Sequence, residues 1–173
     1  MIVLKLYLKP LEPIEPPDIY QMIQDIGEGQ NGFINSLYSS DLEIFREKLI
    51  RNVEISQGKN LSDGLVPQTI YWFYLYNRPI GYGKLRHRLT DKLLEHGGHI
   101  GYIIRPAERN KGYGKHALGE LVKEAYQKGI NEILLTCNED NMASRKVIEA
   151  NHGFLTEMKE GVCKYWIKRN SSL

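Results

Sequence analysis

The stretch Arg109-Asn110-Lys111-Gly112-Tyr113-Gly114 lies between an apolar run and a helical pattern. The run before it, Ile100–Ile104, is typical of a strand, and residues Lys115–Lys128 repeat apolar side chains at helical spacing. Glycines between a strand and a helix let backbone N–H groups converge at the positive end of the helix dipole, where they bind anions and phosphate above all. Arg109 and Lys111 add positive charge at the same place. The sequence therefore predicts a ligand that carries phosphate.

The same glycines fit a second phosphate-binding pattern. Residues Gly112 to Ala117 match G-x-G-x-x-[GA], which is typical of dinucleotide-binding domains, although the pattern alone is weak. Residues Arg105 to Lys111 separate the glycines from the strand, and only about 60 residues follow, too few for the rest of a doubly wound sheet. A nicotinamide-dependent oxidoreductase is therefore the weaker alternative. A tight turn without a ligand would also need glycines, but it would not need Arg109 and Lys111 at one helix N-terminus.

Length and composition set the outer limits. The chain has 173 residues and a formal net charge of +2, so we expect a single domain over residues 1–173 and no binding of nucleic acid or of a membrane surface. Its two cysteines, Cys137 and Cys163, show no metal-ligand spacing, and they are most simply free thiols in a reducing compartment. We therefore expect no metal site and a cytoplasmic location.

The pattern of apolar residues predicts a mixed α/β fold. Strands are expected over Ile2–Leu8, Thr69–Tyr76, Ile80–Leu89, His99–Ile104, Ile133–Cys137, Phe154–Lys159 and Val162–Lys168, and helices over Asp18–Ile26, from Ser40 or Asp41 to about Val53, over Thr90–His96, Lys115–Lys128 and Asn141–Asn151. Residues Gly27–Ser40 are expected to form a loop. The β–α–β unit between Ile100 and Cys137 should be a right-handed parallel crossover. The prediction is a mostly antiparallel sheet of about seven strands with one parallel pair and helices on both faces.

At this point the chain resembles a known family. Arg109-x-x-Gly112-x-Gly114 is similar to the R/Q-x-x-G-x-G/A pyrophosphate loop of the GNAT superfamily of acyl-CoA-dependent N-acetyltransferases. Asn141-x-x-Ser144, followed by Gly153-Phe154, is similar to that family's N-x-x-A/S…G-F segment. The resemblance covers the C-terminal half, and the order of elements in the N-terminal half is also typical of the family. Trp72, residues 86–89 and residues 97–102 look like one bacterial subgroup.

The resemblance implies a function and a cofactor site. Such an enzyme would move an acetyl group from acetyl-CoA to a primary amine of a small-molecule or peptide acceptor that the sequence does not identify. The two parallel strands would splay apart, and main-chain groups of Ile103 and Ile104 would bind the pantetheine arm between them. Backbone N–H groups of Arg109, Asn110, Lys111, Gly112, Tyr113 and Gly114 would bind the pyrophosphate. Asn141 would bind the pantetheine or order the loop beneath it, and Ser144 would also help to hold the cofactor.

The proton-transfer groups depart from the family pattern. Many members place a tyrosine seven residues after the equivalent of Asn141, where it protonates the departing thiolate, and here that position is Ile148. His87 and His99 are candidate bases because histidine titrates near neutral pH, although a structural role is the preferred interpretation for both. A CoA-binding regulatory domain without turnover is therefore a second alternative.

Two features of the surface are also predicted. Arg86 and Arg88 alternate with His87, so they share one face of a strand, where they would either bind an acidic acceptor or form a solvated edge. The strand Val162–Lys168 is expected to supply an edge for a homodimer.

Overall fold

The computed structural model describes residues 4–170 of the chain. Its strands are β1 (Leu6–Pro10), β2 (Gly29–Gln30), β3 (Phe33–Ile34), β4 (Gln68–Leu75), β5 (Arg78–Arg86), β6 (Ile100–Ile104), β7 (Glu132–Asn138), β8 (Phe154–Lys159) and β9 (Val162–Lys168). Its helices are α1 (Pro17–Ile26), α2 (Leu42–Ser56), α3 (Asp91–Glu95), α4 (Tyr113–Gln127) and α5 (Met142–Ala150), with a 3₁₀ turn η1 at Pro106–Glu108. The first strand was expected from Ile2, but Ile2 and Val3 lie outside the described residues.

Several helix starts follow from side chains that cap them. Asp41 accepts hydrogen bonds from the N–H groups of Glu43 and Ile44 at the start of α2. Thr90 accepts from Leu93 N–H at α3, and Asn141 accepts from Ser144 N–H at α5. Each cap satisfies a backbone donor that has no partner within its helix. Asn141 was expected to cap its helix, and the structure confirms it.

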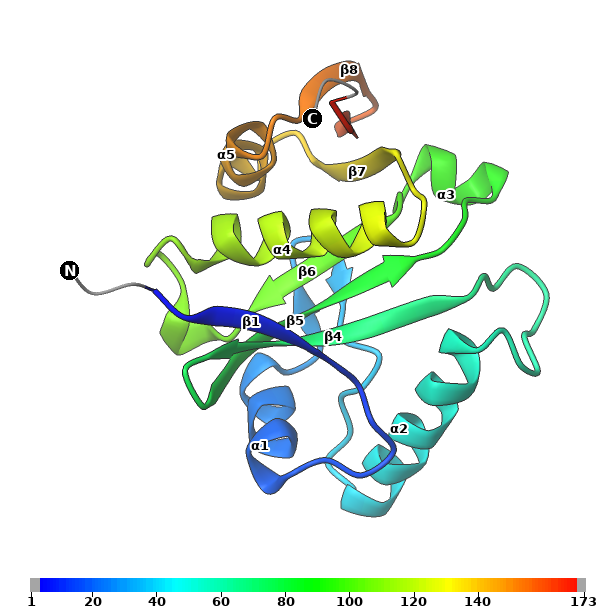
Figure 1. Cartoon of the computed structure of the whole chain (residues 1–173), viewed down its shortest axis with the longest axis vertical. Helices are drawn as coiled ribbons and strands as arrows, with labels where there is room; N and C mark the ends of the chain where they lie inside the picture. Colours follow the sequence, from blue (N-terminus) through cyan, green and yellow to red (C-terminus); the bar gives the residue numbers. More distant parts are fainter. Residues whose placement is uncertain (1–3, 171–173) are drawn as a thin grey trace.

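Helices cover both faces of the four-stranded sheet, as predicted. In Figure 1, α1 and α2 lie on one face and α4 lies on the other. Strand β4 is buried on both faces of the sheet. On one face Ile70, Trp72 and Tyr74 pack with α1 and α2. On the other face Tyr71, Phe73 and Leu75 pack with α4. This alternation is what a strand requires. The core on the α4 side also includes residues of β7, α5 and β9, so α4 joins the two halves of the molecule.

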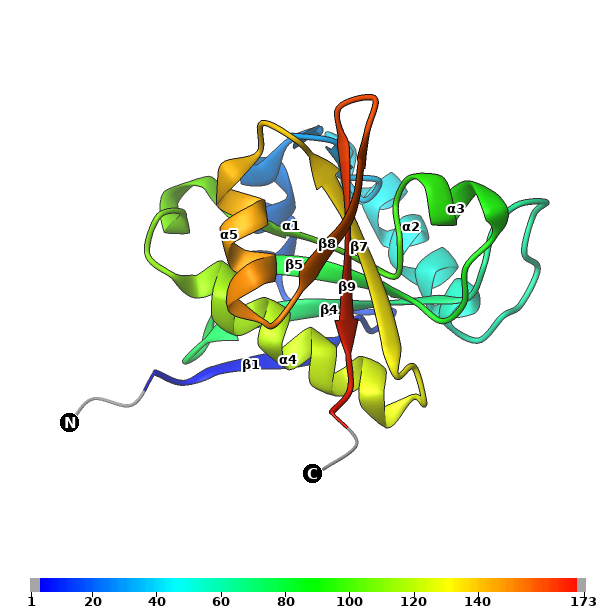
Figure 2. The same cartoon turned by 90° about the horizontal axis from the view of Figure 1, so that it is seen from above.

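The longer strands form two sheets and not the predicted single sheet of about seven strands, and within residues 4–170 the predicted parallel pair of β6 with β7 is not among the strand pairs of either sheet. The first sheet has the order β1-β4-β5-β6 and the second has the order β7-β9-β8, and both consist of antiparallel pairs. A short hairpin of β2 and β3 lies in the region expected to be loop. Figure 2 shows β7, β8 and β9 running across the first sheet, beside α5.

The position of β9 corrects the expected dimer edge. Strand β9 pairs with β7 on one side and with β8 on the other, so its hydrogen-bonding edges are occupied within the chain. The edge strands of this sheet are β7 and β8, and β8 is exposed along its length. A homodimer formed through an edge at Val162–Lys168 is therefore excluded by the topology.

Candidate functional site

Strands β6 and β7 come together at one end and diverge toward the other. His99 N–H donates to the carbonyl of Leu134 at 2.8 Å, and Leu134 N–H donates to His99 Nδ1 at 3.0 Å. Gly98 precedes this contact with φ of +63°, and a Cβ built on it would lie 2.4 Å from the Leu134 carbonyl oxygen, so only glycine fits. Because the imidazole accepts the bond that a backbone carbonyl would otherwise accept, strand pairing stops here. The expected splay of these strands starts at His99.

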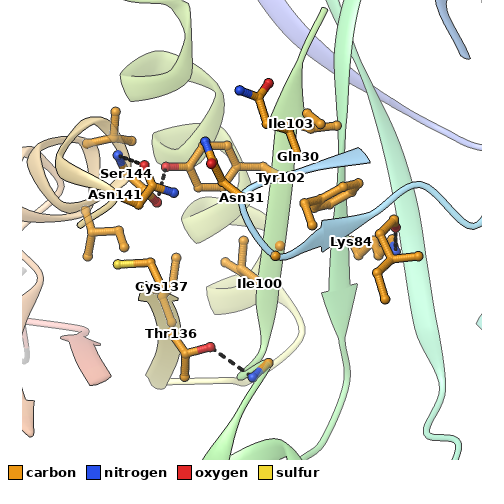
Figure 3. Close-up of a pocket in the computed structure, with 18 of the residues that line it drawn as sticks. Gln30, Asn31, Lys84, Ile100, Tyr102, Ile103, Thr136, Cys137, Asn141 and Ser144 are labelled. Carbon is orange, nitrogen blue, oxygen red and sulfur yellow. Dashed lines mark hydrogen bonds between the residues drawn. The ribbon is translucent and has the colours of Figure 1, made fainter. Parts of the chain in front are cut away.

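A cavity of about 980 Å³ lies where the strands have separated. Its walls come from β6, the ends of β5 and β7, the start of α5, the β2–β3 hairpin and the loop that leads into α4. Figure 3 shows Tyr102, Cys137, Asn141 and Ser144 on one side of β6. The dashed bond at Thr136 in the same view is the one that Gly97 N–H donates to Thr136 Oγ1 at 2.9 Å, and it also holds the narrow end together. A cavity of this size accommodates a cofactor-sized ligand.

The loop of residues 109–114 forms one end of this cavity. Gly112 is the N-cap residue of α4, with φ of +84°, and no side chain caps the first turn. The backbone donors of that turn are therefore presented to a ligand at the positive end of the helix dipole. Asn110 also has positive φ, at +62°, which turns the chain into the helix. The structure thus brings the sequence-predicted phosphate loop to the cavity, with Arg109, Asn110, Gly112, Tyr113 and Gly114 in its lining.

The two basic side chains of the loop are held in place. Arg109 Nε donates to the carbonyl of Ile104 at 2.8 Å, and its Nη1 donates to the side-chain oxygen of Gln30. Lys111 Nζ pairs with Glu108 at 3.4 Å, and Glu108 also pairs with Arg78 at 2.9 Å. Arg109 therefore fixes the loop to the end of β6 and to the β2–β3 hairpin. Lys111 does not line the cavity as the structure stands.

The main chain of β6 corrects one predicted contact. At the two ends of β6, Arg86 N–H donates to the His99 carbonyl and Arg105 N–H donates to the Ile80 carbonyl. Because hydrogen-bonded residues alternate along an antiparallel strand, every second residue from His99 to Arg105 directs its main-chain groups to β5. Ile103 is one of them, and its carbonyl oxygen lies 2.4 Å from a Cβ built on Gly81. The main chain of Ile103 therefore faces β5, and that of Tyr102 and Ile104 faces the β7 side.

Tyr102 bridges the gap toward α5. Its hydroxyl lies 3.2 Å from Ser144 Oγ, and Ser144 is followed one helical turn later by Ile148 on the same face of α5. Ile148 is buried and has no proton to give. Burial raises the pKa of Tyr102 to about 12, so its hydroxyl stays protonated at neutral pH. The phenol therefore lies one turn from the position where the family resemblance implied a tyrosine.

Lys84 is a cavity residue that the sequence reasoning missed. It lies on β5 and is only 8% exposed, and its ammonium donates to the carbonyl of Ile34 at 2.8 Å. Burial, with a smaller effect of nearby Arg86, lowers its pKa to about 8. The only sequence signal was a lysine inside the otherwise apolar run Ile80–Leu85. The β2–β3 hairpin that covers Lys84 was also missed, because two-residue strands show no periodicity.

His87 and His99 lie outside the lining of the cavity. His87 Nε2 lies 2.7 Å from Thr69 Oγ1, and burial lowers its pKa. Burial is also the main cause that lowers the pKa of His99 to about 4, with Arg86 adding to it, so the ring is neutral and its Nδ1 accepts the Leu134 bond described above. The structure therefore gives each imidazole a structural contact, and a catalytic role for either stays a prediction.

The protein family of this chain follows from its similarity to known proteins. Residues 34–154 match the model of the acetyltransferase (GNAT) family, and the chain belongs to that family. The match covers more than half of the chain and includes β6, the phosphate loop, α4, β7 and α5. The prediction of an acetyl-CoA-dependent N-acetyltransferase is thereby confirmed, with its acceptor not identified.

Solved structures share the fold over almost the whole chain. One is RimL, a ribosomal L7/L12 α-N-protein acetyltransferase in complex with coenzyme A, at 19% identity and a TM-score of 0.71, covering 95% of this chain and 94% of that one. Another is the Campylobacter jejuni N-acetyltransferase PseH with acetyl coenzyme A, at 14% identity and 0.65, covering 96% and 100%. A third, from Salmonella typhimurium, modifies the N-terminal serine of L7/L12, at 18% identity and 0.65, covering 95% of each chain. No curated protein gives a significant match.

Two further observations concern other classes of ligand. Between residues 4 and 170, no helix is long and apolar enough to cross a membrane. Within the same range, no three side chains of the His, Cys, Asp or Glu type lie together as metal ligands. Cys137 and Cys163 are free thiols.

Proposed function

We propose that residues 1–173 form one cytoplasmic acetyltransferase domain that binds acetyl-CoA in the cavity between β6 and β7. The pyrophosphate would bind backbone N–H groups of residues 109–114, and the pantetheine would bind the main chain of Tyr102 and Ile104 and the side-chain amide of Asn141. One observation carries this proposal. The uncapped N-terminus of α4 opens onto a cavity of about 980 Å³ that starts where His99 ends strand pairing.

We also propose that Tyr102 and Ser144 stabilise the departing thiolate. The acceptor amine attacks the thioester carbonyl, its C–N bond forms as the C–S bond breaks, and the proton that the amine loses can neutralise the sulfur. A phenol with a pKa of about 12 donates a hydrogen bond to a thiolate more readily than it gives up its proton, because thiols have pKa values near 8.5. Tyr102 therefore acts as a donor aimed at developing charge, with Ser144 fixing its hydroxyl.

The acceptor is proposed to be a primary amine of a small molecule or a peptide. Within the described residues, Glu108 is the only carboxylate that lines the cavity, and its two ion pairs hold it at the phosphate loop. His96 also lines the cavity, so the amine enters as the neutral base or loses its proton to His96, to water or to the acceptor itself. Because one structural neighbour modifies an N-terminal serine, peptide N-termini belong in any acceptor screen.

The test is thiol release from acetyl-CoA across a panel of free amino acids, polyamines and short peptides. Amine-dependent thiol release supports turnover. Tight binding of acetyl-CoA with no release from any amine would instead favour the CoA-binding regulatory domain. Stabilisation by NAD and not by CoA would overturn the assignment of the cavity.

The loop assignment has a matched pair of variants at the two ends of α4. Gly112 and Gly129 have φ of +84° and +83°, and a Cβ on either would meet no atom within 4 Å. Gly112→Asp and Gly129→Asp therefore impose similar backbone strain, but only the first places a carboxylate beside the proposed pyrophosphate. We expect Gly112→Asp to lose CoA binding and Gly129→Asp to retain it. Equal affinities in the two variants would contradict the loop assignment.

A further inference from the structure

Strand β5 contributes to the cavity a buried cation without a carboxylate partner, Lys84. Lys84 Nζ donates to the Ile34 carbonyl at 2.8 Å and lies 4.6 Å from the centre of the Phe33 ring. Both contacts orient the ammonium, but neither carries the negative charge that would neutralise it. Lysine is rarely buried unless it is paired, because removal of the charge from water is costly. An ammonium held in this way indicates that its counter-charge comes from a ligand.

Arg86 extends the same positive surface. Two residues along β5 from Lys84, it points to the same face, and its guanidinium donates to the carbonyls of Gly97 at 3.3 Å and Gly98 at 3.1 Å. These acceptors are again neutral. Two cations, Lys84 and Arg86, therefore line the cavity, and within the described residues neither is paired with a carboxylate.

The position of Lys84 separates it from the cofactor loop. Its partner across the strand pair is Gly101, so its side chain lies on the opposite face of the sheet from Tyr102. Figure 3 shows Lys84 on one side of β6 and Tyr102 with Ser144 on the other. The phosphate loop has its own cations, Arg109 and Lys111, at the far end of β6. Lys84 and Arg86 are therefore placed to contact the molecule that approaches the thioester from the other side.

We propose that the acceptor amine carries an anionic group, with a carboxylate as its simplest form, and that Lys84, supported by Arg86, holds that group. This inference rests on the proposed acetyl transfer. The acceptor is then an amine that also carries an acid group and not a polyamine. A second cation on the acceptor would be repelled by the positive charges of Lys84 and Arg86. The carboxylate can be the α-carboxylate of a free amino acid or an acidic side chain near a peptide N-terminus.

Matched acceptors distinguish these sources. In one arm, L-alanine and L-phenylalanine are compared with their carboxamides in the thiol-release assay. In the other arm, the dipeptide amides of Ala-Glu and Ala-Gln are compared, so that only the side-chain carboxylate differs. We expect kcat/KM for the acid to exceed that for the amide by about tenfold or more in at least one arm, since a hydrogen bond between charged groups is the strong kind. Equal or better use of the neutral member in both arms, or preference for a polyamine, would overturn the proposal.

The variant Lys84→Met tests the residue. It keeps the length of the side chain and removes the buried charge, and we expect the preference for the acid over the amide to fall to near unity. Lys123→Met, at an exposed position of α4 paired with Glu120, is the matched control and should keep the preference. Lys84→Gln, checked by its thermal transition, provides a second variant if Lys84→Met folds poorly. Retention of the preference in a folded Lys84 variant would contradict the assignment.

A binding measurement separates this inference from the proposed function. N-acetylalanine and N-acetylphenylalanine, with their carboxamides, are titrated calorimetrically into the CoA-loaded protein, together with the acetylated dipeptide amides. Selective binding of the acids that is lost in Lys84→Met supports the anion site even if no amine is acetylated. Turnover of amines combined with equal binding of acids and amides would overturn the anion site while leaving acetyl transfer intact.

Discussion

At the scale of single residues, Tyr102 is the side chain on which the chemistry most depends. Its hydroxyl meets Ser144 on α5, one turn before Ile148. We expect Tyr102→Phe to lower kcat by about 100-fold, the usual loss when one donor to developing charge is removed. CoA affinity should change little, because the ring stays. Tyr126→Phe, on α4 outside the cavity, is the control. An unchanged kcat in Tyr102→Phe, measured by thiol release, would remove Tyr102 from the mechanism.

His99 gives a prediction for stability against pH. The pKa of His99 in the folded chain is about 4, below the ordinary value of 6.5. Between these two pH values the imidazole is protonated in the unfolded chain and neutral in the folded one. The stabilisation is complete above about pH 6.5 and is lost as pH falls toward 4, where the loss amounts to roughly 3 kcal/mol. Urea unfolding at pH 8, 6 and 4 measures it. His99→Asn keeps an acceptor near Nδ1 without the titration, and its stability should fall less over this range. Identical pH profiles would contradict the assignment.

At the scale of elements, the start of α4 contains two glycines with different requirements. Gly112 has φ of +84° in open space, whereas a Cβ on Gly114 would make ordinary contacts of 3.6 to 4.0 Å with Val147, Tyr102 and Ile104. Gly112→Ala should therefore cost about 1 kcal/mol of folding free energy through backbone strain. Gly114→Ala should be neutral or stabilise by up to about 1 kcal/mol, since alanine favours helix. Denaturant unfolding of both variants checks this, and the reverse order would contradict the loop geometry.

The same scale shows what local sequence can predict. The helices at Asp41, Thr90 and Asn141 were predictable because a capping side chain and a run of periodic apolar residues coincide there. The division into two sheets was not, because strand composition does not encode whether neighbouring strands pair. That outcome depends on Gly98 and on the imidazole of His99 meeting Leu134. The edge predicted for Val162–Lys168 was wrong for a related reason, since strand order is a property of the assembled sheet.

In the candidate site as well, local sequence could predict some residues and not others. The loop of residues 109–114, most of which lines the cavity, could be singled out because its glycines and basic residues are close together in the chain, and its binding of phosphate stays a prediction. Lys84, Gln30 and Phe33 reach the cavity only through the pairing of β5 with β6 and through a hairpin of two-residue strands, and neither leaves a periodic pattern. Ile103 was placed one residue out of register, because main-chain direction alternates along a strand and its phase is set by the partner.

At the scale of the whole molecule, the cavity separates two sheets that are otherwise joined through α4 and the contact at His99. A ligand that bridges β6 and β7 should therefore stabilise the fold as a unit. At about 100 times its dissociation constant, CoA should add about 2.7 kcal/mol and raise Tm by roughly 5 to 10 °C. Hydrogen exchange should slow at residues 102–104, 109–114 and 135–138, which surround the cavity, and change little in the exposed edge strand β8. Protection confined to residues 109–114 would mean that CoA binds the loop without bridging the sheets, and the pantetheine would then lie outside the gap.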